Sequence, residues 1–420
     1  MGHIVNSERE YRLLQQRLDH NVTGAPYSPV FIEILKLLFS AEEAEIARQI
    51  PLRPTSIALL SRKIGMPVEV LQEKIQRMAE KGLVFDLEYN HDCYVVLAPV
   101  VIGFFEFVYM RTRQELPMKE LAQLFDQYMF QDDRFAHSIF EESTQVGRSL
   151  VREEALLAED YTEVLDWEKA SVAITSAGRV GVSLCACRHK ASHLGKSCDA
   201  PQRTCLTFGG SADLLIKKGM AQEVTSREAM DILEECKEAG LAQIADNVQR
   251  NIGFICNCCG CCCGMFQAMK TFNMRSAVVS SNWIAAITIE KCVGCGLCSK
   301  ACPVGAIGIN SKKEAICEES LCLGCGVCVK SCKLNCIGMK ARPKRVFVPE
   351  TTFDRMVMMA MERGKLSNFI FDDPSRFSHR ALGRIATLIE KSPPVKAILG
   401  IESIRSVFCR TIVAGAKKYT

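Results

Sequence analysis

Eight cysteines between residues 292 and 332 occur in two copies of one spacing. The copies read CVGCGLCSKACP and CLGCGVCVKSCK, and each follows the pattern C-x2-C-x2-C-x3-C. Three thiols separated by two residues fit one tight loop around a face of a cubane cluster, and the fourth ligand then comes from elsewhere. Eight thiolates are enough for two 4Fe-4S clusters. A zinc site, in which four thiolates form a tetrahedron, accounts poorly for this doubled spacing.

The doubled motif resembles that of bacterial two-cluster ferredoxins, in which the fourth Cys of each run binds the other cluster. The resemblance implies that one cluster is held by Cys292, Cys295, Cys298 and Cys332. It implies that the second cluster is held by Cys322, Cys325, Cys328 and Cys302. Four glycines in the loops permit left-handed backbone and a close approach to the cluster: Gly294, Gly296, Gly324 and Gly326. Pro303 fits the family pattern, whereas Lys333 stands where the second copy would have proline.

A second group of thiols lies upstream of this motif. Its first part has the spacing C-x-C-x10-C-x6-C and consists of Cys185, Cys187, Cys198 and Cys205. Arg188, His189 and Lys190 directly follow Cys187. Cationic neighbours lower the pKa of a thiol and favour the thiolate that metals bind.

The second part of the upstream group is unusually dense. Six thiols fall within eight residues, at Cys256, Cys258, Cys259, Cys261, Cys262 and Cys263. Cys is often buried as a small apolar residue, but adjacent thiols with glycines and no aliphatic company indicate metal binding. The ten thiols of residues 185–263 could hold two clusters with two thiols spare, or one cluster and a reactive dithiol.

The combination of C-x-C-R-H-K, C-D-A-P and C-N-C-C-G-C-C-C with a following two-cluster motif resembles a set of bacterial 4Fe-4S proteins. The resemblance covers about residues 150–345. It implies iron–sulfur binding and redox work and names no substrate. His189 and His193 could replace thiolate ligands, as in Rieske centres, or tune nearby sulfurs. The abundance of thiols favours tuning. Cys93, Cys236 and Cys317 are interpreted as structural and Cys336 as spare.

The N-terminal segment predicts an order of elements that resembles a winged helix. Helices are expected at residues 55–64 and 68–81, and strands at 84–89 and 93–97. A DNA-reading second helix should be basic. Here the outward positions are mostly acidic or neutral: Glu69, Gln72, Glu73, Gln76 and Glu80. This argues against DNA binding and favours a docking or dimerisation module.

The expected fold class is α+β with several domains. We expect a winged-helix-like domain at 1–110, a helical linker at 111–178 and an α/β cysteine-rich iron–sulfur domain at 179–285. A ferredoxin module at 286–345 and a helical C-terminal extension at 346–420 follow. Residues 180–184 read as the strand that delivers the first thiols, Thr225 and Glu228 form a capping box, and helices are expected at 353–362 and 378–391.

Cysteine usage and charge indicate the environment in which the protein works. The 23 cysteines are an odd number in dense, metal-like spacings, which predicts a reducing, anaerobic cytoplasm. No signal peptide is expected, and the most apolar stretch, residues 94–105, is too short to span a membrane. Residues 1–180 carry 19 Lys or Arg against 28 Asp or Glu, whereas residues 181–420 carry 33 against 20. The basic half could attract an acidic partner or compensate the charge of anionic clusters.

These features favour an electron-transfer protein over a stand-alone enzyme. The sequence has no Gly-rich phosphate loop, no dinucleotide fingerprint and no nucleophile paired with a base. The first hypothesis is a relay between two ferredoxin clusters, one or two further clusters in residues 185–263, and a partner oxidoreductase or redox protein. The alternatives are a redox-sensing winged-helix regulator and a reductase with catalysis at Cys256–Cys263. A homo-oligomer is compatible with either.

Overall fold

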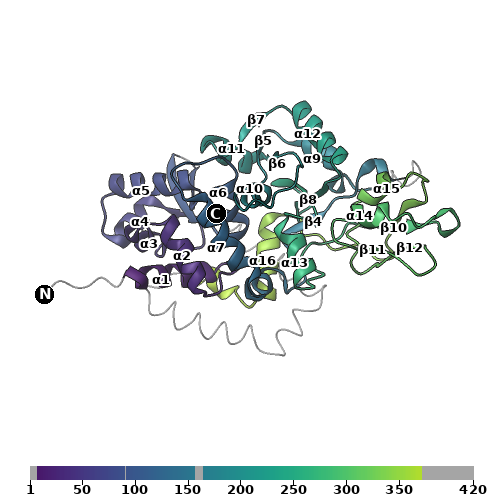
Figure 1. Cartoon of the computed structure of the whole chain (residues 1–420). Coiled ribbons are helices and arrows are strands. Elements are labelled where there is room, and N and C mark those ends of the chain that lie inside the picture. Colours follow the sequence, from purple (N-terminus) through teal and green to yellow (C-terminus); the bar gives the residue numbers. More distant parts are fainter. Residues whose placement is uncertain (1–6, 90, 157–163, 371–420) are drawn as a thin grey trace. The chain divides into compact units, whose positions relative to one another are not determined.

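The structure, a computed structural model, describes residues 7–89, 91–156 and 164–370 (Figure 1). The chain divides into two compact units. Among the described residues, the helical unit lies within 7–108, 112–144 and 353–370, and the cysteine-rich unit lies within 109–111 and 145–352. Both motif regions, residues 185–263 and 292–332, therefore belong to one unit. The predicted α+β class is confirmed.

The helical unit is built on an amphipathic helix that begins after a serine cap. Its helices are α1 (Ser7–Asp19), α2 (Pro29–Leu38), α3 (Ala41–Ala47), α6 (Phe105–Tyr109), α7 (Met118–Phe130), α8 (Arg134–Phe140), α16 (Thr352–Glu362) and α17 (Ser367–Ile370). The Ser28 hydroxyl accepts a hydrogen bond from the Val30 amide and starts α2. Phe31 on its buried face stacks on Tyr128 of α7, with ring centroids 4.6 Å apart. The predicted helix at 353–362 is confirmed as α16, and that at 378–391 lies outside the described residues.

The same unit contains the predicted helix–helix–hairpin segment. It consists of β1 (Thr55–Ser56), α4 (Ile57–Ile64), α5 (Val68–Lys81), β2 (Val84–Tyr89) and β3 (Asp92–Leu97), with sheet order β1-β3-β2. Gly65 ends α4 in the left-handed region at φ 76°. Leu71, Ile75 and Met78 form the buried face of α5, as the periodicity predicts.

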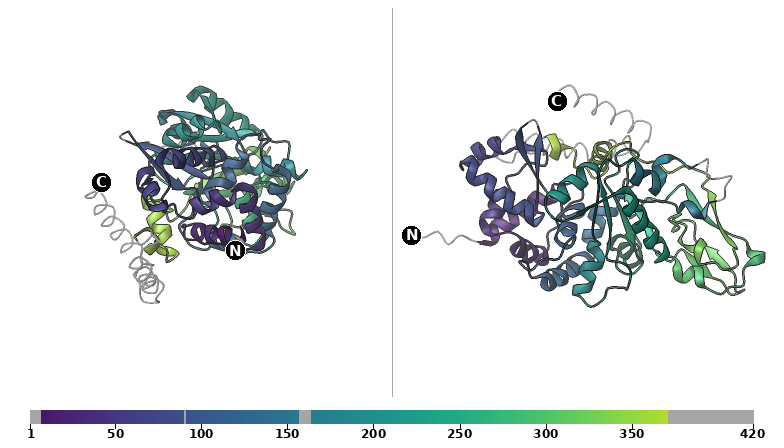
Figure 2. Two further views of the ribbon diagram at one scale, coloured as in Figure 1. Left: turned by 90° about the vertical axis from the view of Figure 1, so that its left-hand side faces the viewer. Right: turned by 90° about the horizontal axis from the view of Figure 1, so that it is seen from above.

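The cysteine-rich unit begins with a six-stranded antiparallel sheet. Its strands are β4 (Gly147–Ser149), β5 (Val180–Leu184), β6 (Arg203–Phe208), β7 (Gln222–Val224), β8 (Ala242–Asp246) and β9 (Phe254–Cys258), in the order β4-β8-β9-β6-β5-β7. The accompanying helices are α9 (Ala170–Ser176), α10 (Ala186–His193), α11 (Gly209–Lys217), α12 (Ser226–Glu238) and α13 (Gly264–Thr271). The teal helices α11 and α12 lie against the sheet (Figures 1 and 2). The predicted strand at 180–184 and the Thr225–Glu228 capping box are confirmed.

The predicted helical linker at 111–178 is wrong for part of its length. Residues 147–149 form the edge strand β4, which pairs with β8, and Arg148, Leu150 and Arg152 are buried. The acidic composition of the neighbouring residues suggested a solvated helix, but pairing with a distant strand overrides such local preferences. The segment is thus part of the core of the cysteine-rich unit.

The ferredoxin-like part of the same unit is a two-fold repeat with an offset of 30 residues. It comprises β10 (Trp283–Ile287), α14 (Leu297–Ala301), β11 (Ile307–Ile309), β12 (Ala315–Cys317), α15 (Val327–Ser331) and β13 (Ile337–Ala341). The strand β10 pairs with β13, and β11 pairs with β12. Ile287 pairs with Ile337 across β10 and β13, and Ile307 pairs with Cys317 across β11 and β12. The offset of 30 residues carries position 287 to 317 and position 307 to 337, so the repeat converts one pair into the other.

Candidate metal centres

The eight ferredoxin-type thiols form two neighbourhoods in the structure. Set I is Cys292, Cys295, Cys298 and Cys332, and set II is Cys302, Cys322, Cys325 and Cys328. Electrostatic interactions join members within each set, including the crossing of the fourth Cys from one run to the other. This arrangement brings together the residues that the resemblance implies as ligands. The ligand assignment itself stays a prediction.

The loops are suited to anionic sulfur. The amides of Ala315 and Ala306 donate hydrogen bonds to the Sγ atoms of Cys292 (3.4 Å) and Cys302 (3.2 Å). The amides of Ala315 and Gly294 lower the pKa of Cys292, whereas burial raises the pKa of Cys325 to about 12. A metal that binds Cys325 must therefore displace a firmly held proton. The amide donors and glycine loops fit a 4Fe-4S cluster in each set.

The two loops differ sharply in exposure although their sequences repeat. Val293 and Leu297, beside Cys295, are 64% and 38% exposed. Their equivalents Leu323 and Val327, beside Cys325, are both 3% exposed. Cys295 is likewise exposed and Cys325 buried. Set I therefore lies near solvent, and set II faces the interior of the cysteine-rich unit.

Each set has a fifth thiol beside it, which the repeated cysteine spacing does not predict. The Cys336 Sγ lies 3.1 Å from that of Cys332, and the thiol of Cys317 hydrogen-bonds to Cys322. The repeat places Cys336 at the position of Ala306 and Cys317 at that of Ile287, so the two extra thiols come from different positions. Aligning the two halves with a 30-residue offset could have revealed both. The bond from Cys317 lowers the pKa of Cys322 to about 6.

Gly324→Ala is expected to prevent assembly of the cluster at set II. Gly324 has φ 66°, and an added Cβ would overlap the carbonyl oxygen of Trp283. Iron and acid-labile sulfide should fall by about four each per chain. Gly296→Ala is the matched control, because Gly296 has φ 75° but open space at its Cβ position. It should cost only about 1–2 kcal/mol of backbone strain. Equal iron content in both variants would contradict the prediction.

The sheet order explains why the upstream thiols meet. The strand β6 is antiparallel to both β5 and β9, which are its neighbours. The carboxyl ends of β5 and β9 and the amino end of β6 therefore share one edge of the sheet. Cys185 follows β5, Cys205 lies near the start of β6, and Cys258 ends β9. Residues separated by more than 70 positions thus converge at this edge.

The ten upstream thiols separate into two groups. The four-thiol group is Cys198, Cys259, Cys261 and Cys262, whose Sγ atoms all lie within 4.8 Å of one another. The six-thiol group is Cys185, Cys187, Cys205, Cys256, Cys258 and Cys263, which are connected by thiol hydrogen bonds and electrostatic interactions. The adjacent residues Cys258 and Cys259 belong to different groups, because β9 ends between them and the chain turns.

Thiols within each group stabilise one another's thiolates. A hydrogen bond from Cys262 lowers the pKa of Cys259 to about 4. Bonds from Cys205 and Cys258 lower the pKa of Cys256 well below its usual value, and bonds from Cys187 and Cys258 do the same for Cys263. A lowered pKa favours the thiolate, which is the form that binds metals.

A buried arginine interacts with both upstream groups. Arg188 is fully buried, and its guanidinium donates hydrogen bonds to the carbonyl oxygen of Asn257 (2.9 Å) and to the Thr204 hydroxyl. Burial alone would lower the pKa of Arg188, but its interactions with Cys185 and Cys259 raise it overall. The guanidinium therefore stays charged beside the thiols, in agreement with the cationic neighbour that the sequence predicts.

The two histidines of α10 have partners other than metal. The Nδ1 of His189 lies 2.7 Å from the carbonyl oxygen of Tyr109, and its ring packs edge-on against the Tyr109 ring. His193 lies against His189, with ring centroids 4.9 Å apart, and burial lowers its pKa. The structure thus commits one nitrogen of His189 to the backbone rather than to a ligand role.

Two contacts join set II to the four-thiol group. The Arg152 amide donates to the Cys325 carbonyl oxygen (3.1 Å), and the Arg152 guanidinium donates to the carbonyl oxygens of Lys237 (3.0 Å) and Leu241 (2.9 Å). Leu241 packs in a buried cluster with Cys259 and Cys262. At the second contact, a Cβ on Gly260 would lie 2.7 Å from the carbonyl oxygen of Pro303. Neither contact is predictable from the cysteine spacing.

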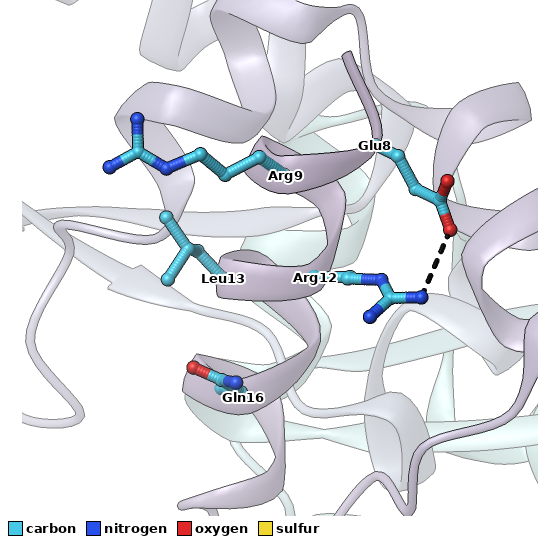
Figure 3. A pocket seen from close by; sticks show the side chains of 5 residues that line it. All are labelled: Glu8, Arg9, Arg12, Leu13 and Gln16. Atoms are coloured by element: carbon cyan, nitrogen blue, oxygen red, sulfur yellow. Dashed lines mark hydrogen bonds and ion pairs between the residues drawn. The ribbon is translucent and has the colours of Figure 1, made fainter. Parts of the chain in front are cut away.

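An open hollow on the helical unit lacks the metal-binding side chains of the thiol groups. It is lined by Glu8, Arg9, Arg12, Leu13 and Gln16 of α1, and Glu8 forms an exposed ion pair with Arg12 at 3.3 Å (Figure 3). The hollow contains no thiol and presents charges of both signs. We therefore place the candidate site at the thiols of the cysteine-rich unit.

Comparison with known proteins identifies one segment of the chain. Residues 285–308 match the family model of the 4Fe-4S binding domain. The match includes the first C-x2-C-x2-C-x3-C run, from Cys292 to Cys302. No curated protein and no solved structure is significantly similar to the chain. The match and the clustered thiols show an iron–sulfur protein. Within the described residues, no helix is long and apolar enough to cross a membrane.

Proposed function

We propose that this protein relays electrons between an external redox partner and metal held by the upstream thiols. Bound 4Fe-4S clusters supply one-electron redox chemistry. The unequal exposure of the two ferredoxin loops carries the proposal. The loop of Cys295 is open to solvent, where a partner can approach, and the loop of Cys325 contacts Arg152 inside the unit. A ferredoxin that only exchanges electrons with outside partners has no need for a second cluster loop buried against the rest of its unit.

The proposed ligands are the members of sets I and II, which hold two 4Fe-4S clusters. We further propose that residues 185–263 hold at least one more cluster. Arg152 and Gly260 bring set II into contact with residues beside the upstream thiols, and Arg188 keeps a positive charge next to them. These contacts bring set II close to the upstream thiols, so electrons have a short path between them. The nearby arginines favour anionic sulfur at both sites.

The composition suggests an acidic redox protein or oxidoreductase subunit as the partner, in a reducing cytoplasm. Residues 181–420 have an excess of basic side chains, and Lys300 on α14 is exposed next to set I. Complementary charge accelerates encounter between proteins. The helical unit is then left for docking or dimerisation.

Metal analysis tests the proposal directly. Protein purified without oxygen should contain about 12 or more iron atoms and as many acid-labile sulfides per chain, because the ferredoxin sets alone account for about 8. Electron paramagnetic resonance of the reduced protein should show more than two interacting centres. A chain that binds about 8 iron atoms, with no further signal, would limit the function to a two-cluster carrier.

Val293→Glu should slow reduction by an acidic flavodoxin used as the probe. The new carboxylate lies beside the exposed Cys295 loop, and like charge slows encounter at low ionic strength. Val293→Lys should have the opposite effect, and both differences should shrink at high salt. Stopped-flow absorbance measures the rate. Leu59→Glu, at another exposed apolar residue, on α4, is the control. Identical rates for the two Val293 variants would exclude this loop as the docking site.

A reductase remains the second candidate because the six-thiol group exceeds the need of one cluster. A cubane takes four thiolates, so two of the six would be available as a dithiol. Disulfide reduction driven by a reduced viologen should then be measurable in the intact protein. Failure to reduce a range of disulfides would remove this candidate.

A DNA-binding regulator is not supported by the surface of α5. Its three basic side chains are ion-paired: Lys74 with Glu42 (2.7 Å), Arg77 with Glu73, and Lys81 with Glu43 (2.8 Å). Cations neutralised in this way are poorly placed to meet phosphates. We therefore propose that residues 1–110 form a winged-helix-like module for protein contacts.

A further inference from the structure

The four-thiol group is more compact than a cubane cluster requires. The Sγ atoms of Cys261 and Cys262 lie 3.6 Å apart, and those of Cys262 and Cys198 lie 4.0 Å apart. All four Sγ atoms lie within 4.8 Å of one another. Tetrahedral thiolates at about 2.3 Å from one ion are about 3.8 Å from each other. Around a cubane the thiolates bind different irons at the corners of a cube and are roughly 6 Å apart.

The same structure provides an internal comparison. Among the residues that it describes, the four-thiol group alone brings three or more His, Cys or acidic ligand atoms within 4.8 Å of one another. Sets I and II, whose first run belongs to the segment matched as a 4Fe-4S domain, do not form such a compact group among the described residues. The difference in spacing therefore separates the four-thiol group from the cluster-type sets of the same chain.

We propose that Cys198, Cys259, Cys261 and Cys262 bind a single tetrahedral metal ion, Zn²⁺ or Fe²⁺, and not an iron–sulfur cluster. Four thiolates in a tetrahedron suit either ion. Cys259 and Cys262 have the C-x2-C spacing that is usual for such sites.

The buried side of the four-thiol group is closely packed. Cys259 and Cys262 pack in a buried cluster with Ala191, Cys236 and Leu241. Between the ligands, the backbone of Gly260 approaches Pro303 so closely that a Cβ would meet it at 2.7 Å. An ion that joins Cys198 to the loop 259–262 would hold this loop against the ferredoxin-like repeat.

A single ion in the four-thiol group determines where a further cluster can lie. If four of the ten hold one ion, the six-thiol group is the place for the further cluster of the relay. The expected composition is then about 12 iron atoms and 12 sulfides in clusters, plus one ion without sulfide. This inference does not depend on the relay. A single ion without a third cluster would refute the relay alone, and about 16 iron atoms with 16 sulfides would refute the single ion alone.

Cys261→Ala tests the proposal in the full-length protein purified without oxygen. Cys261 is exposed, so its removal should leave the fold intact. The expected result is the loss of about one zinc, or one iron, per chain with no loss of acid-labile sulfide. Loss of about four irons together with four sulfides would overturn the proposal, and so would an unchanged metal content.

Cys236→Ala is the matched control. Cys236 is buried in the same cluster as Cys259 and Cys262 but stands outside the four-thiol group. This variant should keep the ion. X-ray absorption at the zinc edge of the unaltered protein gives an independent result, with four sulfurs at about 2.3 Å and no iron neighbour expected. If the ion is iron, the Mössbauer spectrum should show one mononuclear high-spin ferrous site that Cys261→Ala removes. Absence of both signatures would equally overturn the proposal.

Discussion

Arg188→Met should strip metal from the upstream thiols and leave the two clusters proposed for sets I and II in place. Burial raises the pKa of Cys185 to about 12, and the Arg188 charge acts against this rise. Without the guanidinium, more protons must be displaced before metal can bind, so affinity falls. Iron and sulfide should approach the value of about 8 per chain that sets I and II alone can hold.

The same change should also destabilise the fold around the sheet edge. The Asn257 carbonyl oxygen and the Thr204 hydroxyl would lose their partner, and the thiolates beside Arg188 would lose their cation and take up protons. Loss of one partner of a buried ionic interaction costs about 3–5 kcal/mol. Chemical denaturation of the protein, monitored by circular dichroism, measures the change in the free energy of unfolding.

Two further variants make the Arg188 prediction specific. Arg188→Lys keeps the charge without the two-pronged geometry, so it should retain part of the upstream metal. Arg179→Met removes an exposed arginine of the same unit, which pairs with Asp213 and Glu223 at the surface. It should keep all of the metal. The explanation fails if Arg188→Met has the same iron content as Arg179→Met.

Gly260→Ala should slow electron exchange between the ferredoxin sets and the upstream thiols without removing any metal. The added Cβ would lie 2.7 Å from the carbonyl oxygen and 3.0 Å from the Cα of Pro303, so the backbone must move. Overpacking of this kind costs about 1–3 kcal/mol. This backbone movement separates the loop 259–262 from Pro303, the residue that follows Cys302 of set II. Gly260→Val should have a larger effect, because it needs more room.

Stopped-flow reduction followed by rapid freezing measures the exchange, with paramagnetic signals reporting each centre in turn. Gly264→Ala is the control at the other end of the same thiol-rich stretch, because its Cβ position has open space. It should exchange electrons as the unaltered protein does. If Gly260→Ala and Gly264→Ala are indistinguishable, the Gly260–Pro303 contact has no part in the relay.

The sequence alone determined the features that depend on short-range geometry. The doubled cysteine spacing identified an iron–sulfur segment, because three ligands of one cluster fit within one loop. The apolar period of residues 68–81 and the Thr225–Glu228 capping box likewise predicted α5 and the start of α12, since neighbouring side chains stabilise helices and their ends. Arg188 was recognised as a cation among thiols for the same reason.

The tertiary structure decided which thiols meet and which face solvent. Cys258 and Cys259 are neighbours in sequence but belong to different groups, because the turn after β9 directs them apart and the order β9-β6-β5 supplies their distant partners. The equivalent residues Val293 and Leu323 differ in exposure, and the second loop is contacted by Arg152 at Cys325 and by Ser281 at Leu323. Pairing between distant strands and burial by distant segments are long-range properties, so the spacing of cysteines along the sequence does not predict them.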